Sequence, residues 1–163
     1  MHAGQKAYLE ERHEARKWHG RGGRGRAILT EPVFDGSELR GWTLHRLQRD
    51  DHAKPPVVHS LWRRGAAMSV LLAIDLFVCN SVKAAHDQLI QALGNMESDA
   101  VERQTDKSAP GDVAFALGET MVLFARANIV VLIRNAGPEV VSVFVVAHRL
   151  DALLVRPRPE RKR

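Results

Sequence analysis

The stretch GDVAFALGETMVLFARANIVVLIRNAGPEVVSVFVVAHRLDALL, from Gly111 to Leu154, is the most strongly patterned part of this 163-residue chain. It opens with apolar segments of strand character, is interrupted by the breaker at 135–138, and closes with apolar residues at helical spacing. We expect a short strand over 113–117, a turn at 118–119, a long strand over 121–133 and a packing helix that ends at Leu154. This pattern is typical of a protein core.

The segment 140–146 admits two interpretations. Its valines favour a strand, and the preceding Asn-Ala-Gly turn would then close a hairpin. Against this, Pro138 and Glu139 suit the first turn of a helix. Continuity into 147–154 favours the helix, with one apolar stripe formed by Val140, Val143, Ala147, Leu150 and Leu154.

An earlier part of the chain predicts a similar order of elements. A strand over 57–62 and a longer one over 68–79 precede a helix that starts after Asn80 or Ser81 and stops near Gly94. The second strand is apolar on both faces, so we expect it in the middle of the sheet. The strand near Trp42 would extend that sheet, and 96–110 is a polar connection.

These elements predict an α+β fold in which an antiparallel sheet is built from two strand-strand-helix (ββα) units, 57–94 and 113–154, with the helices packed on the sheet. The chain is long enough for one domain, which we place at 27–154. Residues 1–26 are predicted to form a basic flexible arm, because glycine recurs through 20–25. Residues 155–163 form a basic tail.

The net charge of +5 resides in the two ends of the chain. Residues 1–26 and residues 155–163 each carry +4, whereas 27–154 carries −3. Nucleic-acid binding depends on clustered Lys and Arg on the binding face. A nucleic-acid partner is therefore expected only through the tails.

Targeting segments are not evident in the sequence. Residues 1–26 have no apolar stretch of the kind that a secretory signal needs. The run 63–79 has charged residues before an apolar segment, but Asp75 interrupts it and it is too short to span a membrane. A buried strand accounts for it better, and the localisation stays open.

Chemical motifs are sparse. No glycine-rich phosphate loop, nucleophile elbow or metalloprotease pattern occurs. His45, His52 and His59 fall seven residues apart, but a strand-loop-strand layout does not bring three such rings together, so no metal is expected. The single Cys79 lies in an apolar run and is interpreted as a buried thiol. No cofactor is expected.

Seven residues remain as candidates for a site. Arg126 and Asn128 are predicted to point to one face of the long strand, where they would bind an anion, although an ion pair from Arg126 to Asp112 or Asp75 is the simpler interpretation. His148 and Asp151 are three residues apart on the predicted helix and would be neighbours. Such a pair suits a general base, but a structural role near a helix end is simpler. The full set is Asp75, His86, Asp112, Arg126, Asn128, His148 and Asp151.

The second half of the chain resembles small bacterial α+β domains of extracytoplasmic sensors and lipoproteins, including the PsbP/Mog1-like group. The resemblance rests on Gly111-Asp112 before a hairpin, on Arg126-Ala-Asn128, and on Ala147 and Asp151 in the closing helix. It covers about a quarter of the chain, implies an extracytoplasmic α+β domain, and brings no catalytic motif. The chain departs from this group in that 1–26 shows no export signal.

Three functional hypotheses follow. The first is a non-catalytic domain that binds a small molecule or a protein through a sheet face or a helix-sheet crevice. The second is a small cofactor-independent enzyme that uses a His/Asp pair, and the third is nucleic-acid association through the basic tails. A homodimer is a further expectation, because an open sheet has edge strands that invite pairing.

Overall fold

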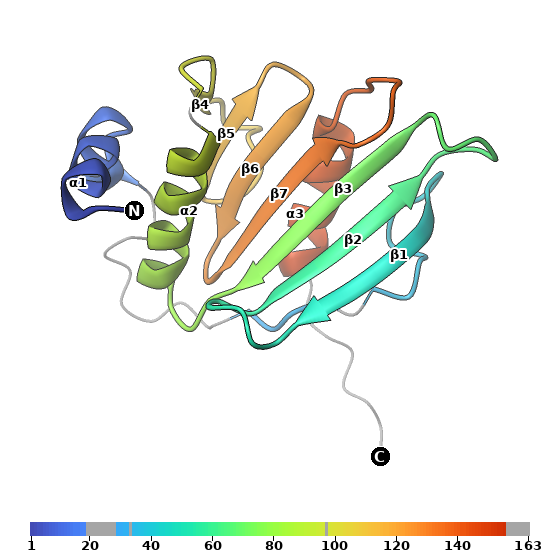
Figure 1. Cartoon of the computed structure of the whole chain (residues 1–163), viewed down its shortest axis with the longest axis horizontal. Coiled ribbons are helices and arrows are strands. Elements are labelled where there is room, and N and C mark those ends of the chain that lie inside the picture. Colours follow the sequence, from blue (N-terminus) through green and yellow to red (C-terminus); the bar gives the residue numbers. More distant parts are fainter. Residues whose placement is uncertain (19–28, 33, 97, 156–163) are drawn as a thin grey trace.

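The computed structural model describes residues 1–18, 29–32, 34–96 and 98–155. Within these residues one seven-stranded antiparallel sheet runs in the order β1-β2-β3-β7-β6-β5-β4 (Figure 1). The predicted α+β class with an antiparallel sheet is confirmed, and β3 lies inside the sheet as expected. The strands are β1 (Thr43–Asp50), β2 (Val57–Arg63), β3 (Leu71–Val78), β4 (Glu102–Gln104), β5 (Val113–Leu117), β6 (Met121–Arg126) and β7 (Ile129–Asn135).

The two long helices lie on opposite faces of the sheet (Figure 1). Helix α2 (Val82–Met96) covers β6 and β7 on one face, and α3 (Phe144–Val155) packs behind the same part of the sheet on the other. The Ser81 side chain caps α2 as predicted, because its hydroxyl accepts a hydrogen bond from the Ala84 N–H at 3.0 Å. None of the helices in the described residues is long and apolar enough to cross a membrane.

Strand alternation divides the interior into two cores, one on each face of the sheet. On the α3 face, Trp62, Ile74 and Phe124 pack against the helix and against the segment before β1, which contributes Phe34, Leu39 and Trp42. On the α2 face, Phe115 and Leu123 pack against α2 residues such as Leu89. Cys79 belongs to this second core and is 4% exposed.

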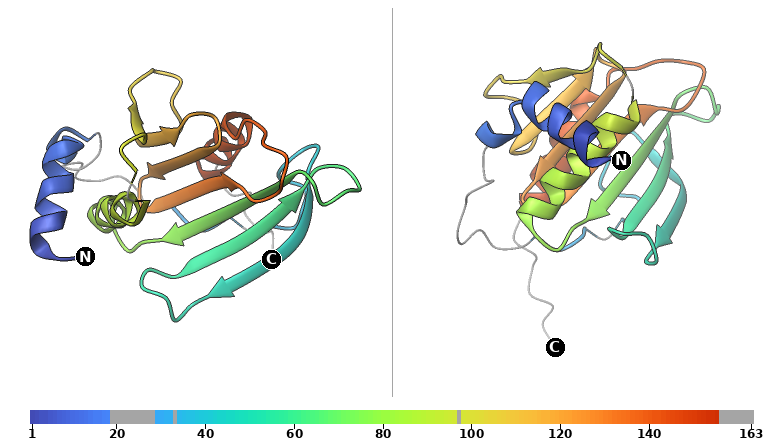
Figure 2. Two further views of the ribbon diagram at one scale, coloured as in Figure 1. Left: turned by 45° about the horizontal axis from the view of Figure 1, so that its top comes forward. Right: turned by 60° about the vertical axis from the view of Figure 1, so that its left-hand side comes forward.

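The N-terminal segment is part of the second core, which differs from the prediction of an arm. Helix α1 (Ala3–Arg12) lies against the outer side of α2 (Figure 2), and the short 3-10 helix η1 (Ala15–Lys17) follows α1. Leu9 and Trp18 are 8% and 3% exposed. The prediction of an arm relied on the glycines at 20–25 and did not consider that Leu9 and Trp18 could be buried. Residues 19–28 and the tail 156–163 lie outside the described residues.

The long strand predicted over 121–133 is wrong, because the chain reverses at 127–128 and forms the hairpin β6-β7. Arg126 pairs with Ile129 across this tight turn, and Ala127 adopts the left-handed conformation with φ 51°. The predicted ββα units are consequently not confirmed. Three consecutive strands precede each long helix, β1 to β3 before α2 and β5 to β7 before α3, and the additional short strand β4 lies within the predicted connection 96–110.

The closing helix is confirmed, but it starts at Phe144. Segment 140–143 is neither helix nor strand, because neighbouring groups take its backbone hydrogen bonds. The Val141 N–H donates to the Asn135 side chain at 2.9 Å, and the Val143 N–H donates to the Glu119 carbonyl at 3.0 Å. These contacts anchor the chain across the end of β7 before the helix begins.

Candidate functional site

Among the residues that the structure describes, one half of one sheet face is covered by no helix. Helix α2 covers the β5-β6-β7 part of its face, whereas β1, β2 and β3 are open in front (Figure 1). Strand pairing arranges the side chains here in two neighbouring rows that run across β1, β2, β3 and β7. We call this surface the open sheet face; its rows are Gln48, His59, Asp75 and Leu132, and Arg46, Leu61, Ala73 and Arg134.

Asp75 is the centre of the open sheet face. Its carboxylate accepts a hydrogen bond from Arg134 Nη1 at 2.6 Å and is bonded to His59 Nδ1 at 2.7 Å. The Asp75 side chain is only 10% exposed, whereas those of His59 and Arg134 are 46% and 47% exposed. The prediction that Asp75 is paired is confirmed, but its partners come from β2 and β7, and Arg126 is not one of them.

The exposed groups around Asp75 make this surface locally basic. The ion pair with Asp75 engages Arg134 Nη1, and nearly half of the arginine side chain faces solvent. Arg46 is exposed and donates from Nη2 to the Gln48 side chain at 3.1 Å. With His59 neutral, the two arginines and one aspartate that line this surface give a local charge of +1, although 27–154 as a whole carries −3.

Two depressions follow each other on this side of the sheet. The first, of about 220 Å³, lies over the charged rows and includes Arg46, His59, Asp75 and Arg134. The second, of about 340 Å³, lies between α2 and the β1-β2 loop, with Phe77 and Leu132 among its lining residues. Phe77 is two residues from Asp75, and Leu132 is two residues from Arg134, so each pair shares one face of its strand. The depressions are therefore parts of one surface.

Three of the predicted site residues form a separate ion-pair cluster on the α3 face. Arg126 donates from Nε and Nη2 to the two carboxylate oxygens of Asp151 at 2.7 and 2.6 Å, and from Nη1 to Asp112 at 3.0 Å. Hydrogen bonding to Asp151 raises the pKa of Arg126 above its usual value, although partial burial acts in the opposite direction. Two carboxylates already surround the guanidinium, so this cluster disfavours an added anion and fastens α3 to β6.

The geometry of the β6-β7 turn depends on the same cluster. The second oxygen of Asp112 accepts a hydrogen bond from the Ala127 N–H at 2.8 Å. Gly111 adopts φ 77°, and a Cβ atom at this position would come within 2.5 Å of the Ala125 carbonyl oxygen. Glycine is therefore required for the approach that delivers Asp112 to Arg126. Gly111, Asp112 and Arg126, which were noted in the sequence, thus belong to one cluster.

Asn128 does not share a face with Arg126, because it occupies the turn after β6. It is 1% exposed, and its amide joins three segments of the chain. The side-chain oxygen accepts from the Leu29 N–H at 2.6 Å, and the nitrogen donates to the carbonyls of Leu29 and Cys79 at 3.1 and 2.9 Å. These bonds use both N–H donors of the amide and one lone pair of its oxygen. The geometry assigns Asn128 to the scaffold.

The remaining candidates do not join these groups. Asp151 is bound by Arg126, whereas His148 is exposed one turn earlier on α3, beside the Phe144 ring at a centroid distance of 6.4 Å. The predicted His148-Asp151 pair is therefore not formed. His86 is 2% exposed in the α2 core, where its ring lies edge-on to Trp18 at 5.4 Å.

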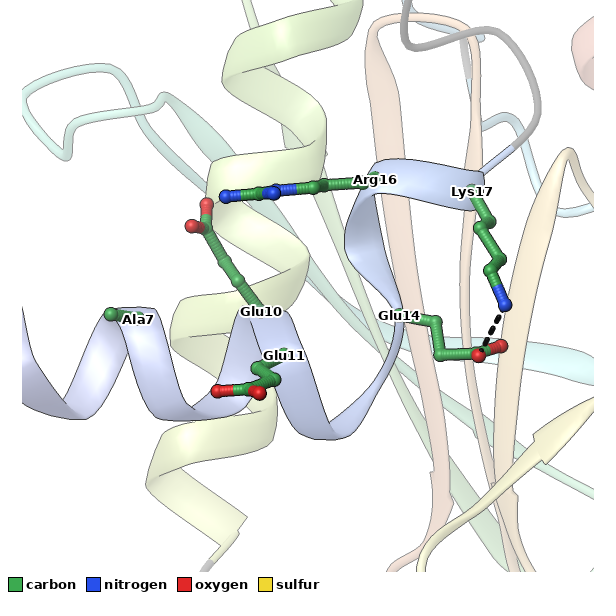
Figure 3. Close-up of a pocket in the computed structure, with 6 residues that line it drawn as sticks. All are labelled: Ala7, Glu10, Glu11, Glu14, Arg16 and Lys17. Atoms are coloured by element: carbon green, nitrogen blue, oxygen red, sulfur yellow. Dashed lines mark hydrogen bonds and ion pairs between the residues drawn. The ribbon is translucent and has the colours of Figure 1, made fainter.

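A further depression lies on the N-terminal segment and is a weaker candidate. It measures about 420 Å³, and Figure 3 shows its lining side chains on α1, on η1 and at Glu14 between them. Lys17 pairs with Glu14 at 2.6 Å, and Arg16 extends towards Glu10 (Figure 3). Its charges thus largely compensate one another. The lining residues are Ala7, Glu10, Glu11, Glu14, Arg16 and Lys17.

The sequence prediction missed His59, Arg46 and Arg134 as members of a site. Their positions follow from strand register, since His59 lies opposite Asp75 and Arg134 lies diagonally from it. A signal was present, because a charged residue in a mostly apolar central strand requires partners on its neighbours. Identifying those partners required the order of the strands. No group of three or more metal-ligating side chains occurs in the described part of the chain.

Comparison of the chain with models of known protein families, with curated proteins and with solved structures finds no match.

Proposed function

We propose that this protein is a non-catalytic binding domain and that it contacts its partner through the open sheet face. The observation that carries the proposal is the uneven covering of the sheet. The α3 face is closed by α3 and by the segment before β1, while α2 closes only half of the opposite face. The open half presents arginines and a histidine around a buried carboxylate, as expected of a surface that meets another molecule.

A protein partner suits this face better than an enclosed small molecule. Sites that enclose small ligands usually measure about 300–1,000 Å³ and are largely apolar. The depression around Asp75 measures about 220 Å³, and Arg46, Asp75 and Arg134 are among its lining residues. A shallow surface of this kind gives affinity when a partner covers both rows of side chains and excludes water from their contacts.

A second candidate function is proton transfer by the His59-Asp75 pair. When His59 Nδ1 donates its hydrogen to Asp75, Nε2 of the neutral ring is left as the proton acceptor. This is the arrangement of an oriented general base. Arg134 also occupies the Asp75 carboxylate, so the pair serves an ion network as well. Binding ranks first because the depression is shallow. His59→Gln should retain partner binding in a binding domain and abolish turnover in an enzyme.

We also propose that this chain is related to the extracytoplasmic PsbP/Mog1-like group. The support for this relationship is that Gly111, Asp112, Arg126 and Asp151 belong to one connected cluster, and that Asn128 holds the turn that follows Arg126. Residues that act together in this way can persist as a pattern while the binding surface changes. The proposed binding role does not depend on this relationship.

Position-specific photo-crosslinking tests the proposed function. A photoreactive amino acid placed at Gln48 lies on the open sheet face, while the same group at Val145 lies exposed on α3, on the other side of the sheet. In cells that produce the protein, the Gln48 position should yield one dominant product that the Val145 position does not. Equal yields from both positions, or a product at Val145 alone, would contradict the proposal.

A further inference from the structure

We infer that the partner presents an extended acidic segment with one apolar anchor to the open sheet face. This inference rests on the proposed function and specifies the chemistry of what binds there. Three features of the surface support it: the spacing of the two arginines, the groove beside α2, and the two-residue repeat that connects them.

The arginines are spaced for two carboxylates. The Arg46 guanidinium is held at Gln48 on β1, and that of Arg134 is held at Asp75 on β3. Strands β1 and β3 are separated by two interstrand spacings, roughly 10 Å. A single small anion would contact one of these guanidinium groups, whereas a chain with several carboxylates contacts both. Arginine also offers more donors than its recorded bonds engage, so each can accept a new carboxylate without releasing its present contact.

The groove beside α2 provides the site for the anchor. Its floor contains Phe77 and Leu132, which are partly buried, and its wall includes Ala92 of α2. The volume of about 340 Å³ admits one large apolar side chain. Gln88 and Gln91 also line the groove and can hydrogen-bond to the backbone of a segment that lies across it.

The groove and the charged group around Asp75 are separated by two residues along β3. Phe77 and Asp75 are two residues apart on β3, about 7 Å in an extended chain. A partner segment that lies along β3 therefore places an apolar side chain at residue i in the groove and a carboxylate near residue i+2 at Arg134. This geometry favours an extended segment over a helix, whose successive turns are spaced about 5.4 Å apart and whose neighbours on one face are three or four residues apart.

The inference is tested with synthetic eight-residue peptides and the isotope-labelled full chain. The acidic probe contains Phe at one position and Glu two and four positions later in a Ser/Thr background. Matched probes replace both Glu by Gln or by Lys, or replace Phe by Ala. Backbone amide shifts at Gln48, His59 and Ala73 locate binding, and their titration gives the affinity.

The acidic probe should shift these three amides, and the Phe-to-Ala and Glu-to-Gln probes should bind more weakly. Combining Arg46→Gln with Arg134→Gln should weaken the acidic probe about tenfold, because two solvent-exposed charge contacts are lost. Lys107→Gln removes an exposed charge outside this face and should leave the affinity unchanged.

Three results would overturn the inference. Neutral or basic probes that bind as tightly as the acidic one would show that charge complementarity is wrong. Tighter binding of a single-stranded oligonucleotide or of anionic vesicles to the same amides would assign the face to another class of partner. If no peptide shifts the face while crosslinking from Gln48 still captures a partner, the acidic-segment inference fails and the proposed binding function stands.

Discussion

Arg126 of β6 and Asp151 of α3 are joined by two parallel hydrogen bonds of 2.7 and 2.6 Å, which fasten the closing helix to the sheet. Their side chains are 23% and 15% exposed, so solvent screens this pair only partly. Asp151→Ala should lower the free energy of unfolding by about 2–3 kcal/mol, because it leaves a partly buried cation with one carboxylate. Urea denaturation measures the change. Glu119→Ala, which removes an exposed carboxylate, is the control and should change stability by less than about 0.5 kcal/mol.

The left-handed backbone of Ala127 predicts a stabilising substitution. Ala127→Gly should raise the free energy of unfolding by up to about 1 kcal/mol. An L-residue at φ 51° is strained by about 1–2 kcal/mol, and glycine relieves this strain. Part of the gain is offset because glycine makes the unfolded chain more flexible. Ala125→Gly, in β6 itself, should destabilise instead. Thermal and urea unfolding of both variants provide the comparison, and a destabilised Ala127→Gly would show that the turn does not carry this strain.

Packing of the N-terminal segment on α2 predicts a large loss on truncating Trp18. This side chain is 3% exposed and contacts the rings of His86 and Phe115. Trp18→Ala should cost about 3–5 kcal/mol, the usual range for removing a buried tryptophan. A variant that lacks residues 1–18 should unfold at lower urea concentration as well. Unchanged stability in both variants would restore the interpretation of this segment as an arm outside the core.

His13 predicts that stability falls in mild acid. Burial, together with nearby Arg12 and Arg103, lowers the pKa of His13 below its usual value, and its ring lies edge-on to Phe115. The folded protein therefore takes up this proton less readily than the unfolded chain, so stability is complete above the ordinary histidine pKa and declines as the pH falls through it. The free energy of unfolding should decrease from pH 7.5 to pH 5.5 by more in the wild type than in His13→Gln. An equal decrease in both proteins would assign the acid sensitivity to other groups.

The sequence was sufficient for the elements whose signals are local. The apolar spacing of α2 and its Ser81 cap predicted that helix, and the apolar residues on both faces of β3 predicted its place inside the sheet. The turn at Ala127-Asn128 was missed because it contains neither glycine nor proline and lies between two apolar runs. Its conformation depends on Asp112, which is fifteen residues before Ala127, and on Leu29. Contacts of this range are not visible in local pattern.

The candidate site divides in the same way. The pair of Arg126 with Asp112 was correctly predicted as one of two alternatives, whereas Asp151 was expected beside His148 and instead binds Arg126. Their assignment as ligand-binding residues remains a prediction, and their mutual contacts favour a scaffold role. The open sheet face was not predicted, since Arg46, His59 and Arg134 are distant in sequence and become neighbours only through the order β1-β2-β3-β7.

The most direct measurement compares the same substitution at the two arginine clusters. Arg126→Gln and Arg134→Gln are each assayed for the free energy of unfolding and for the yield of the photo-crosslinked product from Gln48. Arg126→Gln should lose about 2–4 kcal/mol of stability and keep the crosslinking yield of the molecules that remain folded. Arg134→Gln should lose about 1 kcal/mol or less, because nearly half of the Arg134 side chain faces solvent and His59 still contacts Asp75, and most of the crosslinking yield should disappear. The reverse pattern, with crosslinking dependent on Arg126 and unaffected at Arg134, would contradict the assignment of the open sheet face as the binding surface.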